Sequence, residues 1–422
     1  MNADKKKALI QKIEENRDEI IRCTQGFIRF SSISGREEEA QLYFASLLEK
    51  VSLTNDMTVD IWTPDIEDMS INPYFLSERK SFEGSPNVVG VLKGSGGGRS
   101  IILNGHVDVV PEGIVDWLDH PFSGKLEDGR IYGRGASDMK GGLIAAVMAV
   151  KAICDSNLRL KGDVIIQSVV EEETGGAGTL SAIKRGYKAD AAIVPEPTDL
   201  KICPVSVGAM WFRVTVKGLS AHAATAYLGV SAINKAIKLI QAVEQLEEEE
   251  AKKKQHELYT QKIARVNIGT FRAGNFTTNV PEEAVFEGRM GIKPGEEIAD
   301  VRKELEEIII KTAREDEWMK DNPPVLEWYG FCLNSNEVDQ NHEIVKTLGG
   351  NHEFVTKEKP VIGGTLWGSD AGALTKFAQT PAVVFGPGPG ATAHKANEYI
   401  DVEELITTTK ILTLSLVDWC GL

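Results

Sequence analysis

Acidic residues and histidines directly follow four short apolar segments of this chain. His106 and Asp108 come after the segment SIIL, and Glu171–Glu173 come after DVIIQSVV. Glu196 follows ADAAIV, and His394 follows AVVF and the run GPGPGATA. Imidazoles and carboxylates without cysteine form a nitrogen and oxygen ligand set that suits zinc, manganese or cobalt. The spacing therefore predicts a site for a divalent metal.

The apolar segments predict the sheet that would bring these side chains together. Strands are predicted at residues 87–92, 100–103, 163–170, 189–194 and 382–385, and helices at residues 140–153 and 179–187. Apolar strands that alternate with helices are typical of an α/β fold with a mostly parallel sheet and helices on both faces. Because ligands bind beyond the carboxyl ends of such strands, we expect the acidic residues and histidines to converge there. Asp138, just before a predicted helix, is a fifth candidate.

Three consecutive glutamates, Glu171–Glu173, would ordinarily lie on a solvated helix. Here they follow an apolar strand and precede a glycine-rich turn. Three like charges at the end of a buried strand destabilise one another unless a positive charge compensates them. A divalent metal would supply that charge, which strengthens the prediction of a metal site.

The middle of the chain has a different pattern. Strands are predicted at residues 211–217, 263–271, 284–292 and 324–328, and helices at residues 230–250 and 296–314. The order β-α-β-β-α-β is that of a ferredoxin-like α+β domain. We therefore predict a catalytic domain in two parts, residues 1–206 and 330–422, with an inserted domain at residues 207–329. The second part ends in a helix predicted at residues 402–419.

The composition limits the class of protein. The chain has 422 residues with 47 Lys+Arg and 62 Asp+Glu, a formal net charge of −15, and five scattered cysteines without a CxxC pair. The acidic balance argues against a nucleic-acid partner, and the cysteine pattern indicates a reducing compartment. No apolar run approaches the ~20 residues of a membrane span, and the charged N-terminal segment lacks the pattern of a signal peptide. We therefore expect a cytoplasmic protein without a membrane anchor.

Five motifs resemble those of a known enzyme family. They are GHVDVVP (105–111), GRGASDMKGG (133–142), EEETGGAG (171–178), PEPT (195–198) and the late His394. Together they resemble the two-zinc amidohydrolases, which include acetylornithine deacetylase, succinyl-diaminopimelate desuccinylase, aminoacylase and the glutamate carboxypeptidases. The similarity extends over nearly the whole chain. It implies a zinc-peptidase-like catalytic domain and an inserted lid domain that also forms a dimer interface.

The resemblance implies two divalent metal ions, zinc above all, with cobalt or manganese as alternatives. His106, Asp138 and Glu196 would bind one ion. Asp138, Glu173 and His394 would bind the other, so that Asp138 would bridge the pair.

Neighbours of these ligands are expected to support catalysis. Asp108 lies two residues beyond His106, so both side chains project to the same side of an extended segment, and its carboxylate would accept a hydrogen bond from the imidazole. The resemblance makes Glu172 the general base, which takes a proton from the water between the metals and delivers it to the leaving amine. Glu171 stands where relatives commonly have aspartate, and we expect it to support the other two glutamates.

The inserted domain is expected to contribute to the site. The segment GLSAHA (218–223) resembles the histidine loop of the family, whose histidine reaches the active site of the partner subunit and stabilises the oxyanion. We therefore expect His222 to act in catalysis and the chain to form a homodimer through this domain. Asn279, in TTNVP, matches a family asparagine near the same oxyanion and the substrate.

Two departures from the family bear on the substrate. Relatives that hold a substrate carboxylate place an arginine where this chain has Gly291, and Arg289, on the same strand face, could substitute for it. The segment GGTLWGSD (363–370) resembles the family's GGT-S-D loop with three extra residues. Thr365 and Trp367 of this segment are expected to contact the substrate, the latter through its aromatic face.

These features predict hydrolysis of the amide bond of a small N-acyl amino acid or N-acyl amine, in the manner of acetylornithine deacetylase. One alternative is a di- or carboxypeptidase of the same family, and another is a deformylase or desuccinylase of a related small metabolite. A non-catalytic binding protein is a remote alternative. A nucleic-acid module on the inserted domain conflicts with the acidic balance and lacks aromatic stacking motifs.

Overall fold

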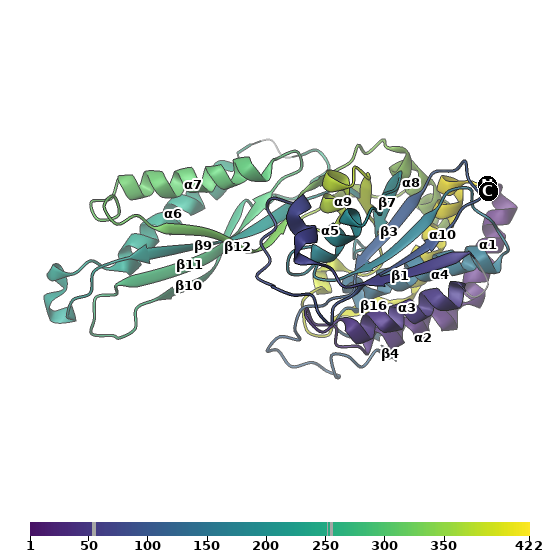
Figure 1. The fold of residues 1–422 in the computed structure, drawn as a ribbon, viewed down its shortest axis with the longest axis horizontal. Helices are drawn as coiled ribbons and strands as arrows, with labels where there is room; N and C mark the ends of the chain where they lie inside the picture. Colours follow the sequence, from purple (N-terminus) through teal and green to yellow (C-terminus); the bar gives the residue numbers. More distant parts are fainter. Residues whose placement is uncertain (53–55, 251, 254–255) are drawn as a thin grey trace. The chain divides into compact units, whose positions relative to one another are not determined.

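The structure is a computed structural model, and it describes residues 1–52, 56–250, 252–253 and 256–422. The chain forms two compact units (Figure 1). The first comprises Met1–Pro73, Arg79–Ser206 and Asn336–Leu422, and the second comprises Tyr74–Glu78 and Val207–Ser335. The second unit therefore ends beyond the predicted residue 329, and it includes a short segment that the sequence pattern did not assign to it.

A mixed sheet of nine strands, counted over the described residues, forms the centre of the first unit. Its strand order is β1-β2-β6-β3-β7-β15-β8-β13, and β14 also pairs with β8. The strands are β1 (Met57–Trp62), β2 (Asn87–Leu92), β3 (Ile101–His106), β6 (Val164–Val169), β7 (Ala191–Val194), β8 (Ile202–Ser206), β13 (Asn336–Glu337), β14 (Ile362–Thr365) and β15 (Ala382–Val384).

The four strands β6, β3, β7 and β15 run parallel at the centre of this sheet. Toward the edges, β2 pairs antiparallel with both β1 and β6, and β8 pairs antiparallel with β15 and β13. The predicted α/β fold class is confirmed, because the centre of the sheet is parallel. These parallel strands are also the ones that precede most of the candidate residues. In register, His106 at the end of β3 lies beside Val169 at the end of β6.

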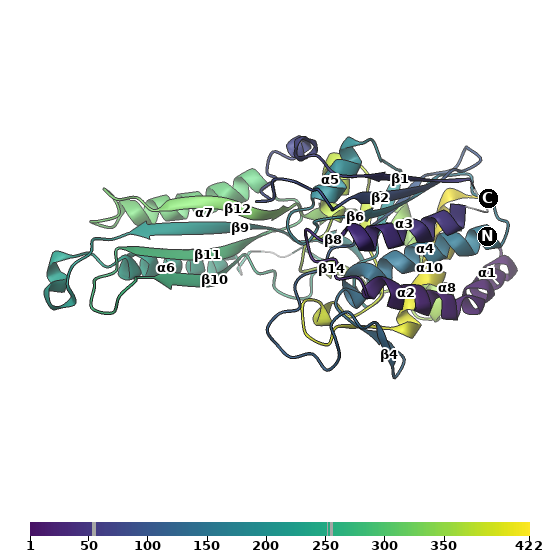
Figure 2. The same ribbon diagram turned by 60° about the horizontal axis from the view of Figure 1, so that its bottom comes forward.

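Helices cover both faces of this sheet, which explains why its central strands are apolar throughout. On β3, Asn104 donates to Thr179 of α5 (Ala177–Lys184), whereas the adjacent Gly105 packs against Leu143 of α4 (Gly141–Asp155). Because successive strand residues face opposite sides, the two helices lie on opposite faces. Nearly every residue of α4 is buried. The other α-helices described in this unit (Figure 1 and Figure 2) are α1 (Ala3–Glu15), α2 (Arg17–Ile28), α3 (Glu38–Ser52), α8 (Glu343–Thr356), α9 (Ala371–Phe377) and α10 (Val402–Cys420).

A small sheet connects two loops that carry candidate ligands. It is formed by β4 (Lys125–Glu127), β5 (Arg130–Tyr132) and β16 (Tyr399–Asp401), in the order β16-β5-β4. Strand β5 leads into the segment that contains Asp138, and β16 follows the segment that contains His394. Pairing between β5 and β16 therefore brings these distant parts of the sequence together.

In its described residues, the second unit contains a four-stranded antiparallel sheet and two α-helices, in the order that the β-α-β-β-α-β pattern predicts. Its elements are β9 (Gly208–Lys217), α6 (Ala232–Glu250), β10 (Val266–Ala273), β11 (Glu283–Ile292), α7 (Ile298–Arg314) and β12 (Val325–Leu333), and the sheet order is β10-β11-β9-β12. Alternate residues of β9, including Phe212 and Val214, are fully buried in a core shared with both helices. Strand β12 is longer than predicted, and this is why the unit ends at Ser335.

Among the described residues, no helix combines the length and apolar character needed to cross a membrane. All five cysteines are free.

Candidate metal centre

The structure gathers the histidines and carboxylates that follow the central strands around one side chain, Asp138. The Nε2 atom of His106 lies 3.1 Å from Asp138 Oδ1 and 3.4 Å from Glu196 Oε1. The Nε2 atom of His394 lies 3.1 Å from Glu173 Oε1 and 3.4 Å from Asp138 Oδ2. Each histidine therefore faces a different oxygen of Asp138, and a second carboxylate accompanies each histidine.

These distances fit a pair of divalent ions. A tetrahedral ion with ligand atoms at about 2.0–2.2 Å places those atoms about 3.3–3.6 Å from one another. The ligand atoms of His106, Asp138 and Glu173 all lie within 4.8 Å of one another. One oxygen of Asp138 faces His106 and the other faces His394, and a different glutamate lies beside each histidine. This is the arrangement expected of an aspartate that bridges two metal ions.

The electrostatics of the cluster also favour bound cations. Burial and the negative charge of Asp138 together raise the pKa of Glu196 to about 8, although His106 opposes this shift. Burial likewise raises the pKa of Glu173. For Asp138, burial opposes ionisation, but hydrogen bonds to His106 and His394 outweigh it and hold its pKa well below the usual range. Several buried carboxylates around two imidazoles are an excess of negative charge, which a divalent ion neutralises.

The main chain, rather than a carboxylate, fixes the tautomer of His106. Its Nδ1 atom lies 2.8 Å from the main-chain oxygen of Asp108 and 3.6 Å from Asp108 Oδ1. Because a carbonyl oxygen only accepts, Nδ1 donates to it, and in the neutral imidazole the Nε2 lone pair is left available for a metal ion on the side of Asp138 and Glu196. The predicted hydrogen bond from the imidazole to the Asp108 carboxylate is corrected, because the nearer acceptor is the carbonyl of the same residue.

The carboxylate of Asp108 instead holds the turn that carries the glutamates. Its Oδ1 accepts the backbone N–H of Glu172 at 3.2 Å, and its Oδ2 accepts that of Glu173, also at 3.2 Å. The Ser34 hydroxyl donates to Oδ2 at 3.3 Å. Asp108 is buried, so these bonds are protected from water. It therefore sets the directions in which two neighbouring glutamates leave the main chain.

The three glutamates have different surroundings. Glu171 is fully buried in a left-handed conformation, with a φ of 63°, and its Oε2 lies 3.6 Å from Arg79 Nη1. Arg79 also lies 3.5 Å from the buried Glu37. Arg79 therefore compensates the charge of Glu171. The sequence pattern had predicted that a metal would compensate all three glutamates, and for Glu171 this is corrected. Glu172 is 6% exposed, and burial raises the pKa of its carboxyl well above the usual value.

Within the second unit, the structure brings His222 and Asn279 together. The two residues form an isolated antiparallel bridge between their loops, and the N–H of Ala223 donates to the Thr278 carbonyl at 2.8 Å. The Nδ1 atom of His222 accepts the N–H of Ala224 at 3.0 Å. A neutral His222 therefore carries its proton on Nε2, which is then a hydrogen-bond donor. The side chain is exposed.

Arg289 occupies the space beside Gly291 on β11. A Cβ atom at position 291 would lie 2.5 Å from the Ala264 carbonyl oxygen, so a larger residue does not fit there without a shift of the backbone. The same Cβ position lies 3.5 Å from Arg289 Nη1. Arg289 is opposite Trp211 of β9 in the register of the sheet.

Thr365 and Trp367 lie in the first unit beside the loop that leads to His394. Thr365 is at the end of β14, and its hydroxyl donates to the main-chain oxygen of Trp367 at 2.8 Å. A Cβ atom at Gly390 would lie 3.7 Å from Trp367 Nε1, which places the indole against the glycine-rich run before His394.

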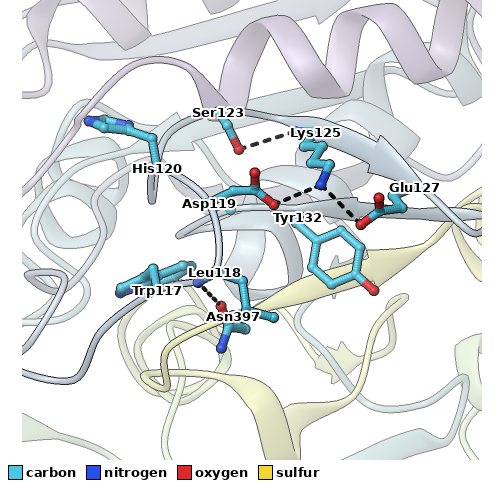
Figure 3. A pocket seen from close by; sticks show the side chains of 10 residues that line it. Trp117, Leu118, Asp119, His120, Ser123, Lys125, Glu127, Tyr132 and Asn397 are labelled. Atoms are coloured by element: carbon cyan, nitrogen blue, oxygen red, sulfur yellow. Dashed lines mark hydrogen bonds and ion pairs between the residues drawn. The ribbon is translucent and has the colours of Figure 1, made fainter.

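A separate pocket of about 220 Å³ in the first unit contains none of these residues (Figure 3). Lys125 pairs there with Asp119 and Glu127, each at 3.0 Å, and the N–H of Leu118 donates to Asn397 Oδ1 at 2.8 Å. We assign no chemistry to this pocket, because its lysine is already paired with two carboxylates.

Similarity to characterised proteins extends over most of the chain. The model of peptidase family M20/M25/M40 matches residues 102–418. An N-formyl-4-amino-5-aminomethyl-2-methylpyrimidine deformylase of Halalkalibacterium halodurans is 31% identical over 438 residues, which cover 98% of this chain and 97% of the relative. An acetylornithine deacetylase of Myxococcus xanthus is 28% identical over 354 residues, which cover 82% of this chain and 89% of the relative. The similarity to the deformylase is thus higher and more extensive than that to the enzyme favoured by the motifs.

Solved structures share the fold. A metallo-carboxypeptidase of Sulfolobus solfataricus superposes with a TM-score of 0.75 at 19% identity, over 94% of this chain and 98% of the other. Human carnosine dipeptidase 1 superposes with a TM-score of 0.74 at 16% identity, over 99% of both chains. At these identities the similarity concerns the architecture alone, and it includes both units.

Proposed function

The chain belongs to peptidase family M20/M25/M40, and we propose from this that it is a metal-dependent amidohydrolase that removes the formyl group from an N-formylated aminomethylpyrimidine. The observation that carries the proposal is the Asp138 carboxylate between two imidazole–carboxylate groups, in a chain similar over nearly its whole length to a deformylase of such a compound.

The contacts around Asp138 support the assignment of the metal ligands. His106, Asp138 and Glu196 would hold one divalent ion, and Asp138, Glu173 and His394 would hold the other. When bound, the two ions would polarise the amide carbonyl as Lewis acids and make water a better nucleophile at neutral pH. Zinc suits these ligands, and cobalt or manganese could replace it.

Glu172 would transfer the proton. Its main chain is fixed by Asp108, and its side chain is not part of either imidazole–carboxylate group. We assign it to accept a proton from the attacking water and to deliver that proton to the leaving amine nitrogen, so that the amide yields formate and a free amine. Burial raises the pKa of this carboxyl, which makes its carboxylate a stronger proton acceptor than that of a solvent-exposed glutamate.

The region around Gly291 supports a substrate that is not recognised through a carboxylate. The backbone leaves no room at position 291 for the arginine with which related enzymes would hold that group. A formylated aminomethylpyrimidine has no carboxylate, but its ring nitrogens accept hydrogen bonds, and Arg289 could donate to one of them. Thr365 and Trp367 would contact the ring, the latter by stacking.

His222 and Asn279 would stabilise the oxyanion that forms when water adds to the carbonyl. The proton on His222 Nε2 gives the loop a donor for this charge. We propose that the chain forms a homodimer and that His222 of the partner subunit serves each metal centre.

We expect that a His222→Ala chain and an Asp138→Asn chain, each inactive alone, will regain activity when mixed into heterodimers. Each heterodimer would contain one centre with intact ligands and an intact histidine from the other chain. The measurement is formate release after co-refolding or exchange of the subunits. Failure of heterodimers, verified by mass spectrometry, to exceed the two homodimers would contradict a shared site.

A substrate panel tests the proposed reaction. We expect kcat/KM for formate release from N-formyl-4-amino-5-aminomethyl-2-methylpyrimidine to exceed that for acetate release from N-acetylornithine by at least about 100-fold. This factor corresponds to about 2.7 kcal/mol of differential transition-state binding. Acetylornithine is the second candidate, because a relative 28% identical acts on it by name. A preference for N-acetylornithine or for dipeptides in the same panel would overturn the assignment.

A further inference from the structure

We propose that the buried ion pair between Arg134 and Glu398 is a positioning device that fixes three of the loops that carry metal ligands, those of His106, Asp138 and His394, an inference that rests on the proposed metal centre. Arg134 is 2% exposed and Glu398 is fully buried, and Arg134 Nη1 lies 2.7 Å from Glu398 Oε2. Neither residue is a candidate ligand, and the two stand 264 residues apart in the sequence.

Glu398 acts on the bridging aspartate. Its other oxygen, Oε1, accepts the backbone N–H of Ser137 at 3.0 Å and that of Asp138 at 3.1 Å. These bonds hold the peptide from which the Asp138 side chain extends. One carboxylate therefore uses one oxygen to hold the aspartate loop and the other to hold the arginine.

Arg134 acts on the two remaining loops. Its Nη1 also donates to the main-chain oxygen of Lys395, the residue after His394, at 3.2 Å. Its Nη2 donates to the main-chain oxygen of Pro111, in the loop that follows His106 and Asp108, at 3.2 Å. The guanidinium carbon also lies 5.1 Å from the centre of the Trp117 ring in that loop. The ion pair thus contacts every loop that leads to or from His106, Asp138 and His394.

The energetics of buried charges favour positioning over stability as the reason for this pair. Removing two charges from water costs free energy that their attraction only partly returns, so apolar or neutral pairs of similar size often serve stability equally well. A neutral pair could not make the three directional hydrogen bonds that the Arg134 guanidinium donates to Glu398, Lys395 and Pro111. Groups that orient metal ligands in this way typically change metal affinity about 10–100-fold when replaced.

Glu398 holds the loop of Asp138, whereas Arg134 holds the loops that adjoin His106 and His394. A double variant can remove the bonds of Arg134 and keep those that Glu398 makes to the Asp138 loop. In Arg134→Met/Glu398→Gln no buried charge is left unpaired, and the glutamine oxygen can still accept the N–H groups of Ser137 and Asp138. The bonds to Lys395 and Pro111 are lost. Lys395 adjoins His394, whereas Pro111 lies five residues beyond His106. We therefore expect the binding of the ion held by His394 to weaken about 10–100-fold, and that of the other ion to change less.

The test is calorimetric titration of the metal-free full chain with Zn²⁺, together with the visible absorption spectrum of the Co²⁺-loaded chain. We expect a weakened step and an altered Co²⁺ spectrum in the double variant, while the melting temperature of its metal-free form stays close to that of the native chain. The matched control is Arg265→Met/Glu296→Gln in the second unit, where Arg265 is 4% exposed and pairs with Glu296 and Glu304. The control is expected to retain both metal affinities and the native spectrum.

Unchanged affinities and spectrum in the Arg134→Met/Glu398→Gln chain would overturn the inference, as would an equal loss of affinity in the control. If the native chain itself failed to bind two ions, the proposed metal centre would be wrong instead. The two failures are therefore distinguishable.

Discussion

Replacing Glu172 with glutamine is expected to lower the turnover of formate release by at least about 10²–10⁴-fold while both metal ions remain bound. The change keeps the size of the side chain and leaves intact the bond from its backbone N–H to Asp108. It removes only the ability to accept a proton from water and pass it to the amine. Turnover is measured at saturating substrate, and metal content is measured by mass spectrometry on the same sample.

Glu171→Gln is the matched control for this prediction. Glu171 is the neighbouring glutamate, but its carboxylate lies beside Arg79 and not beside either imidazole. We expect the control to lose stability rather than turnover. If Glu172→Gln lost metal instead of turnover, Glu172 would be a ligand and the assignment within the three glutamates would be wrong.

Replacing Asp138 with asparagine is expected to reduce the metal content from two ions to less than one per chain and to abolish formate release. Each oxygen of Asp138 faces a different histidine, so its loss affects both ligand groups at once. Asparagine keeps one oxygen but loses the negative charge that two cations share. Asp119→Asn, a change at an exposed carboxylate paired with Lys125, is the control and should retain both ions. Two tightly bound ions in the Asp138→Asn chain would exclude Asp138 as a bridging ligand.

The sequence predicted that the candidate ligands would lie close together, because most of them follow strands of the central sheet. The apolar segments before His106, Glu171 and Glu196 form β3, β6 and β7, which run parallel in the centre of the sheet. Strand direction alone then places the residues that follow at one edge. His394 is separated from β15 by the run GPGPGATA, and Asp138 precedes a helix rather than following a strand, so strand direction places these two residues less directly.

The sequence did not predict the groups that orient these ligands. The bond between the Asp108 carboxylate and the Glu172 main chain depends on how two loops meet, which no local pattern encodes. The same holds for Arg79 beside Glu171 and for Arg134 beside Glu398. A charged residue in a loop is usually solvated, and only tertiary packing shows that these are buried.

The sequence pattern also failed to predict the direction of one strand and one boundary of the second unit. The segment 87–92 is as apolar as the central strands, yet β2 pairs antiparallel with both neighbours. Side-chain burial fixes an apolar pattern but not the direction of a strand. The segment Tyr74–Glu78 belongs to the second unit although it lies far from that unit in sequence, because Tyr74 and Leu76 pack against its core.

Formate release as a function of bound zinc tests the central claim most directly. The metal-free chain is titrated with Zn²⁺, and the release of formate from N-formyl-4-amino-5-aminomethyl-2-methylpyrimidine is followed at each step together with the metal content. We predict no release without metal, full activity once about two ions are bound per chain, and loss of activity when a chelator removes them. Release at the full rate from a chain without measurable metal would contradict the account.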